Sequence, residues 1–136
     1  GVRAKFVEVA TIDEVSRAFA AMAEDPPAAT VVLPSPMFFF LSREMPKRAA
    51  ALRRPVIYPF EESAEAGGLM SYAAPLAESY RRAARYVDLI LKGASPGELP
   101  IEQPTRLSLA VNLKTAALQG IDIPRDILLR ADRLIE

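Results

Sequence analysis

Two adjacent glycines, Gly67 and Gly68, lie between two short apolar runs of the chain. Such a pair indicates that the backbone turns sharply at a point where a side chain would be in the way. The segment just before the glycines is too short for more than a loop or a single helical turn. We therefore predict a strand near residues 55–58, a turn near 61–66 and another strand near 69–72.

Short apolar runs alternate with amphipathic stretches along the whole chain. This alternation is typical of βαβ units, in which parallel strands form a sheet and helices cover it. We expect an α/β fold with a mainly parallel sheet and helices on both faces. The 29–33 run carries no charged residue, so we expect that strand to be buried on both faces. The expected strands are near residues 3–9, 29–33, 55–58, 69–72 and 106–111.

Local signals mark the first two helices. Thr11 and Glu14 have the spacing of a capping box, in which each side chain satisfies a free amide of the other residue. A second helix is predicted over residues 39–53. Pro46 is its weak point, because proline has no amide hydrogen to donate within a helix.

The longest helix is predicted over residues 75–92, where apolar residues recur at helical spacing and Gly93 provides a stop. Residues 94–104 contain too many prolines for regular structure and are expected to form an extended connector. Asn112 is a good N-cap for a short helix over 112–119. Pro124 then opens a last helix, which we expect to reach about residue 134.

Composition restricts the classes of function. The chain has 136 residues, which suits one modest domain, with 17 basic and 17 acidic residues. Zero net charge argues against a nucleic-acid partner, and no apolar run approaches the ~20 residues of a membrane span. Cysteine and histidine are absent, which removes thiolate metal sites and the usual neutral-pH general base. We therefore expect no metal, no cofactor and no catalytic residue, and a binding role.

Five segments occur in a characteristic order: EAGGLMSY at 65–72, YRRAA at 80–84, ILKGASP at 90–96, LPIEQP at 99–104 and VNLKTA at 111–116. This series resembles the C-terminal part of ABC-transporter substrate-binding proteins with the type I periplasmic-binding-protein fold. The resemblance covers essentially the whole chain. It is greatest to the branch that includes tryptophan-type amino-acid binders.

In that family, two α/β lobes hold a ligand in the cleft between them. The resemblance implies that residues 1–68 belong to the second lobe, that 69–105 cross to the first lobe, and that 106–136 return. It also implies that the N-terminal lobe and one central strand lie outside this chain. Where relatives often carry an acidic residue that can face a ligand ammonium group, this chain has Ser35, and Ala73 replaces a usual glycine.

Parallel α/β sheets bind ligands just beyond the carboxyl ends of their strands. Aromatic residues at these ends can stack on a ligand, while hydroxyl and carboxylate groups can form hydrogen bonds to it. Each candidate also has a simpler interpretation: core packing for a phenylalanine, a turn or helix cap for a serine, and a solvated loop for a glutamate. The candidate ligand-binding residues are Ser35, Phe38, Tyr58, Phe60, Glu61, Ser71 and Tyr72.

The resemblance implies a non-enzymatic solute-binding component of an ABC importer, located in the periplasm or elsewhere outside the cytoplasm. It would bind a small molecule, such as an amino acid or an aromatic or carboxylate compound, and deliver it to a membrane permease. No signal peptide opens the chain, and a mature or truncated form would also lack one. The alternatives are the effector-binding domain of a bacterial transcription regulator, which shares the fold, and an enzyme, which the missing histidine and cysteine disfavour.

A sheet without one of its central strands has unpaired strand edges, and such edges are templates for pairing with another chain. We therefore expect this chain to self-associate, to exchange elements with a second copy, or to keep the remainder of the protein bound.

Overall fold

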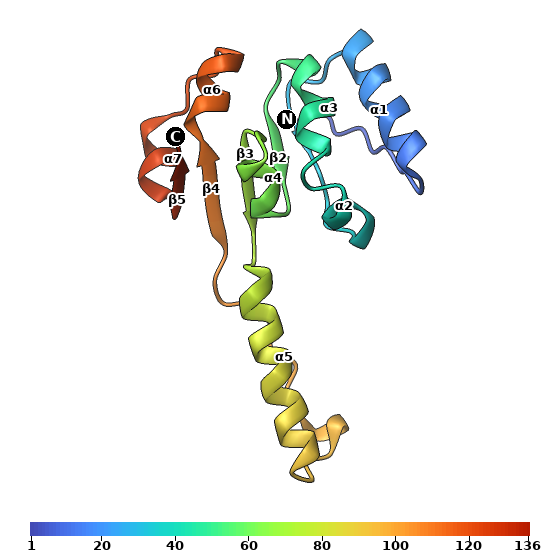
Figure 1. Ribbon diagram of the computed structural model, residues 1–136, viewed down its shortest axis with the longest axis vertical. Helices are drawn as coiled ribbons and strands as arrows, with labels where there is room; N and C mark the ends of the chain where they lie inside the picture. The colour runs from blue at the N-terminus through green and yellow to red at the C-terminus, as the bar shows by residue number, and fades with distance from the viewer.

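A five-stranded sheet forms the centre of the molecule in the computed structural model, which describes residues 1–136 (Figure 1). The strands lie side by side in chain order, and neighbours are parallel except for the antiparallel pair β3–β4. The sheet is therefore mainly parallel, as predicted. The strands are β1 (Thr30–Val31), β2 (Val56–Tyr58), β3 (Met70–Ala73), β4 (Ser108–Asn112) and β5 (Arg133–Ile135).

Helices cover both faces of this sheet, because successive strand residues point to opposite sides and both sides carry apolar residues. One face is covered by α1, α3 and α4, and the other by α6 and α7. The helices are α1 (Ile12–Glu24), α2 (Pro36–Phe40), α3 (Met45–Ala49), the 3₁₀ helix η1 (Ala50–Leu52), α4 (Glu61–Glu65), α5 (Leu76–Leu91), the 3₁₀ helix η2 (Pro96–Glu98), α6 (Leu113–Gln119) and α7 (Arg125–Arg130).

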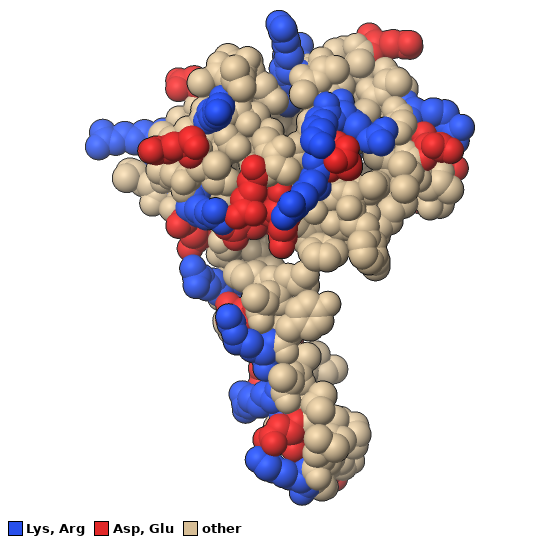
Figure 2. Space-filling model, viewed as in Figure 1, with Lys and Arg blue, Asp and Glu red and all other residues tan.

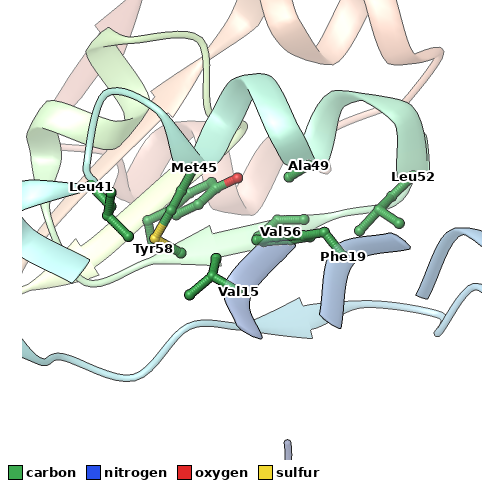
Figure 3. Packing of buried hydrophobic residues seen from close by; sticks show 8 residues of the cluster. All are labelled: Val15, Phe19, Leu41, Met45, Ala49, Leu52, Val56 and Tyr58. Carbon is green, nitrogen blue, oxygen red and sulfur yellow. The ribbon is translucent and has the colours of Figure 1, made fainter. Parts of the chain in front are cut away.

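The larger core cluster lies under α1 and α3. Figure 3 shows side chains from both helices converging on the β2 residues Val56 and Tyr58. The Thr11–Glu14 capping box predicted from the sequence starts α1, which brings the apolar stripe of that helix over the sheet. The members of the larger core cluster are Val15, Phe19, Leu41, Met45, Ala49, Leu52, Val56 and Tyr58.

A smaller cluster on the other face holds α6 and α7 to the sheet. Val111 of β4 is fully buried there, next to Leu69, Ala116 and Ile123. Partly buried residues of α7 and of the segment before it complete this layer. The two clusters therefore stabilise the two faces of the sheet separately.

The glycine pair has the role that the sequence predicted. Gly67 adopts a φ of +101°, in the left-handed region that favours glycine. A Cβ on Gly68 would lie 2.7 Å from the Ser63 carbonyl oxygen and 2.7 Å from Cε2 of Tyr58. The backbone of Gly68 therefore packs directly against an aromatic ring of the core.

Asn112 lies at a buried position where four parts of the fold meet. Its Nδ2 donates to the Ala64 carbonyl at 2.8 Å, and its Oδ1 accepts from the Thr115 amide at 2.9 Å, which caps α6. The Thr115 hydroxyl in turn donates to the Gly67 carbonyl at 3.0 Å. These bonds connect α4, the glycine turn, β4 and α6.

Helix α5 and the connector that follows it, residues 94–104, extend away from the sheet as an arm (Figure 1). The connector is held along α5 by hydrogen bonds from Arg82 to the Gln103 carbonyl and from Tyr86 to the Pro100 carbonyl. In the view of Figure 2, charged side chains gather along one side of the arm, and the other side is mostly uncharged. No residue of α5 is buried.

Three of the five predicted strands, near 55–58, 69–72 and 106–111, are confirmed with small shifts of their ends. The prediction for residues 3–9 is wrong, since these residues form no strand and are almost all exposed. A strand needs a neighbour for its backbone hydrogen bonds, and no other strand lies beside this segment.

The prediction that residues 29–33 form a strand buried on both faces is also wrong in its burial. Only Thr30 and Val31 pair as β1, and Val31 is 66% exposed. This strand lies at the edge of the sheet, and no helix covers its Val31 side. Leu33 is likewise exposed.

Two helix predictions are corrected. The helix predicted over 39–53 is divided into α2, α3 and η1, because Pro46 fits only in the first turn of a helix and α3 therefore starts anew at Met45. The last helix ends at Arg130 instead of about residue 134, and the chain then forms β5 beside β4. The helices predicted at 75–92 and 112–119 are confirmed.

We predict that Gly68→Ala lowers the free energy of unfolding by about 1–3 kcal/mol, because the new methyl group overlaps a carbonyl oxygen and the Tyr58 ring. Urea denaturation of the purified protein measures this change. Gly97→Ala is the matched control, since a Cβ there meets nothing within 4 Å. Equal stability of the two variants would contradict the packing described for the glycine turn.

We predict that Asn112→Ala lowers the free energy of unfolding by about 2–4 kcal/mol. The substitution removes the cap of α6, so the buried Thr115 amide loses its acceptor, and it removes one of the two hydrogen bonds to the Ala64 carbonyl, which keeps only the bond from the Gly67 amide. Thermal or urea unfolding checks the size of the loss. Gln103→Ala, at an exposed position whose side chain forms no hydrogen bond, should change stability by less than about 0.5 kcal/mol.

Candidate functional site

A hollow lies where β2 and β3 end and where α4 and α5 begin. Its volume is about 160 Å³. Two parallel neighbours, β2 and β3, direct their carboxyl ends to the same edge of the sheet, and such an edge is the usual ligand position in α/β folds. The lining residues are Pro59, Phe60, Glu61, Glu62, Ser71, Ala73, Ala74, Pro75, Leu76, Ala77 and Ser108.

Local sequence features form the walls of this hollow. Buried Pro59 ends β2, and the extended backbone of Phe60 leads directly into α4. On the other side, Ala74 and Pro75 connect β3 to α5. The fixed φ of proline suits this position, immediately before the first helical residue.

Three of the seven predicted site residues, Phe60, Glu61 and Ser71, meet at the hollow. The Phe60 ring packs edge-on against Phe39, with 5.2 Å between ring centroids. Ser71 is only 3% exposed, and its hydroxyl forms no hydrogen bond within the chain. The hollow therefore combines an aromatic wall with a free hydroxyl group at its base.

The structure places the other four predicted residues elsewhere. Ser35 caps α2 by accepting from the Phe38 amide at 3.3 Å, and Phe38 packs against the larger core cluster. Tyr58 is 2% exposed, and burial raises the pKa of its phenol well above the usual value. For these three residues the simpler interpretation, a cap or core packing, describes what they do here.

Tyr72 follows Ser71 in β3 and so points to the opposite face of the sheet. It is 46% exposed and does not line the hollow. It lies on the strand that leads into the arm, and its contact with a ligand stays a prediction.

An ion-pair cluster lies beside the hollow. Arg133 of β5 donates through Nη1 to Glu61 and to Glu65, at 2.5 Å and 2.6 Å. These hydrogen bonds, first that to Glu61, raise the pKa of the Arg133 guanidinium above its usual value. Arg133 thereby fixes both ends of α4 against β5, and α4 carries one wall of the hollow.

Sequence reasoning missed Arg133 because it placed that residue in a helix instead of a strand. It placed Glu62 only within the turn predicted near 61–66, and it did not single out Ser108. The register between β3 and β4, in which Ala73 pairs with Ser108, brings that serine to the rim of the hollow. No single-sequence signal reports this cross-strand pairing.

A second hollow of about 350 Å³ lies along the arm, between α5 and the connector. Its polar groups already bind one another: Arg82 contacts Glu78, the Gln103 carbonyl and Thr105, and Tyr86 donates to the Pro100 carbonyl. It is larger than the hollow at the strand ends, but it is the seam along which the connector packs. We therefore take the smaller hollow as the candidate site.

The candidate site offers no arrangement for a metal, since no group of three or more His, Cys, Asp or Glu side chains is placed to hold one. Its chemistry consists of carboxylates, hydroxyls and apolar walls. Such a set suits the binding of a small organic molecule by hydrogen bonds, charge and apolar contact.

Solved structures share this architecture. A crystal structure of a conserved domain protein from Vibrio cholerae matches with a TM-score of 0.81 and 26% identity, over 90% of this chain and 41% of that one. The ABC domain from Streptococcus pneumoniae in complex with L-Trp matches with a TM-score of 0.81 and 21% identity, over 90% and 41%. The chain thus spans about 41% of the length of these two structures.

A ligand-free, open structure of a substrate binding protein with adhesive properties from Clostridium difficile matches with a TM-score of 0.61 and 16% identity, over 93% of this chain and 42% of that one. A search of curated proteins gives no match. The family model described as ABC transporter substrate binding protein matches residues 1–135. The chain therefore belongs to the ABC transporter substrate-binding protein family.

Proposed function

We propose that this chain is part of the solute-binding component of an ABC importer and that its hollow at the strand ends is half of the ligand site. The observation that carries this proposal is the position of the hollow, at the carboxyl ends of β2 and β3 and at the base of the arm. Family membership supports a solute-binding role. The streptococcal structure, which holds L-Trp, supports a small molecule such as an amino acid.

The proposed mechanism is closure of two lobes on the solute. The sheet with its helices, residues 1–68 and 106–136, forms the second lobe, and residues 69–105 reach into the first lobe. Hinge closure around a ligand is an established motion of periplasmic binding proteins. The closed form is then recognised by a membrane permease, which receives the solute.

The exposed apolar side of the arm supports this division into lobes. Tyr80, Val87 and Leu91 recur at helical spacing on α5 and are 68%, 55% and 81% exposed. An amphipathic helix normally packs its apolar stripe on a core. In the proposed full protein, the first lobe covers this stripe.

Such a protein works outside the cytoplasm, so we propose a periplasmic or other extracytoplasmic location. In this structure no helix combines the length and apolar character that crossing a bilayer requires. The net charge of zero gives no support to a nucleic-acid partner. The proposed partners are therefore the solute and the permease.

The ligand proposal is tested with the full-length protein and a thermal-shift screen of amino acids and small aromatic carboxylates. We expect at least one compound to stabilise the protein. Phe60→Ala should then weaken its binding about tenfold in calorimetry, because the aromatic wall of the hollow is lost. Phe6→Ala is the control, since Phe6 is 82% exposed and lies outside the hollow. If no compound stabilises the protein, the proposed function is wrong.

We also predict that the 136-residue chain alone associates in solution, since the arm exposes apolar residues that each gain ~1.5–3 kcal/mol from burial. Light scattering should give a mass above that of the monomer. The double substitution Tyr80→Glu and Val87→Glu should shift the chain toward the monomer, whereas Arg81→Ala, on the charged side of α5, should not. A stable unaltered monomer would contradict this prediction.

A further inference from the structure

The charged groups of the hollow differ in what they already bind. Two carboxylates, Glu61 and Glu62, line it, and no lysine or arginine does. Glu61 is paired with Arg133 of β5. Glu62 is partly buried and forms no ion pair and no side-chain hydrogen bond in the chain. One negative charge at the hollow is therefore unused.

The base of the same hollow contains a second unused polar group. Ser71 is only 3% exposed and lines the hollow. Its hydroxyl forms no hydrogen bond within the chain. The sealed polar atoms without a partner in this structure are Thr30 Oγ1 and Gln119 Oε1, so the Ser71 hydroxyl is open to the hollow, where water or a ligand can bind it. This observation is independent of the carboxylates and points to a hydrogen-bonding ligand.

The remaining walls are apolar. Pro59, Phe60, Ala73, Pro75 and Leu76 surround these polar groups. A metal ion prefers a cage of several oxygen ligands, and no group of three or more acidic side chains is present to form one. An organic cation with an apolar body fits this combination of one free carboxylate, one free hydroxyl and apolar walls.

Resting on the function proposed above, we propose that Glu62 and Ser71 bind the primary ammonium group of the solute and so select amines over molecules that carry only a carboxylate. The ammonium group donates to the Glu62 carboxylate and to the Ser71 hydroxyl, while the body of the solute packs on Phe60. Glu61 does not take this role, because Arg133 already neutralises its charge. Ser35, at the position where relatives often have an acidic residue, is likewise engaged as a helix cap.

The test measures calorimetric affinities of the full-length protein for matched compounds. The first set is the amino acids leucine, phenylalanine and tryptophan. The second set is the corresponding amines, which lack the carboxylate, and the third is the corresponding acids, which lack the ammonium group. We expect amine-bearing compounds to bind, and the acids to bind at least about tenfold more weakly, because a charge-assisted hydrogen bond is lost.

The variant Glu62→Gln keeps the shape of the side chain and should abolish most of this preference, with amine affinity falling about tenfold or more. Glu62→Asp should retain part of the preference, and Ser71→Ala should weaken amine binding by a smaller factor. Glu98→Gln, on the exposed η2 at the far end of the arm, is the control and should leave affinity unchanged.

Three results would overturn the inference. The first is that the acids bind as tightly as their matched amines, and the second is that Glu62→Gln leaves the preference unchanged. In both cases solute binding itself, and with it the proposed function, would still stand. The third is that none of these compounds binds. The wider thermal-shift screen judges the proposed function separately, since it includes solutes without an ammonium group.

Discussion

The arrangement around the hollow depends on the hydrogen bonds of the buried Asn112 side chain. It uses both ends of its amide, donating to the Ala64 carbonyl and capping α6 through the Thr115 amide. Because Ala64 lies in α4, the bond fixes that short helix across β3 and β4. Arg133 holds the same helix from β5. An isolated helix of this length is unstable in water, so these tertiary contacts determine where Phe60, Glu61 and Glu62 lie.

The same physical constraint explains the least regular parts of the chain. Parallel strands are stable when both edges are paired and both faces are covered. Strand β1 lies at the edge of the sheet, so one of its edges is unpaired and one of its faces is uncovered. It contains only Thr30 and Val31. The segment before α1, near residues 3–9, has no neighbouring strand and remains irregular.

Features set by neighbouring residues could be predicted from the sequence, and features set by distant residues could not. The capping box at Thr11, the cap at Asn112 and the turn at Gly68 all depend on residues within a few positions, and all were predicted. Strand β5 depends on pairing with β4, and nothing within its own three residues indicates it. The rule that ligands lie beyond the carboxyl ends of parallel strands led to Phe60, Glu61 and Ser71, which line the hollow. It could not show that Tyr58 faces the core, because that depends on which side of β2 the helices α1 and α3 cover.

The pairing of β3 also limits where the arm can bend if the lobes close as proposed. Four consecutive pairs join β3 to β4, the last between Ala73 and Ser108, and β2 holds the other edge. Beyond that last pair, the two chain segments that lead to the arm have no ladder hydrogen bonds between them. Bending therefore concentrates near Ala74 and Pro75 on one segment and just before Ser108 on the other. Because Ala74, Pro75 and Ser108 line the hollow, a movement that turns the arm also changes the shape of the hollow, and under the proposed function this would couple solute binding to the orientation of the lobes.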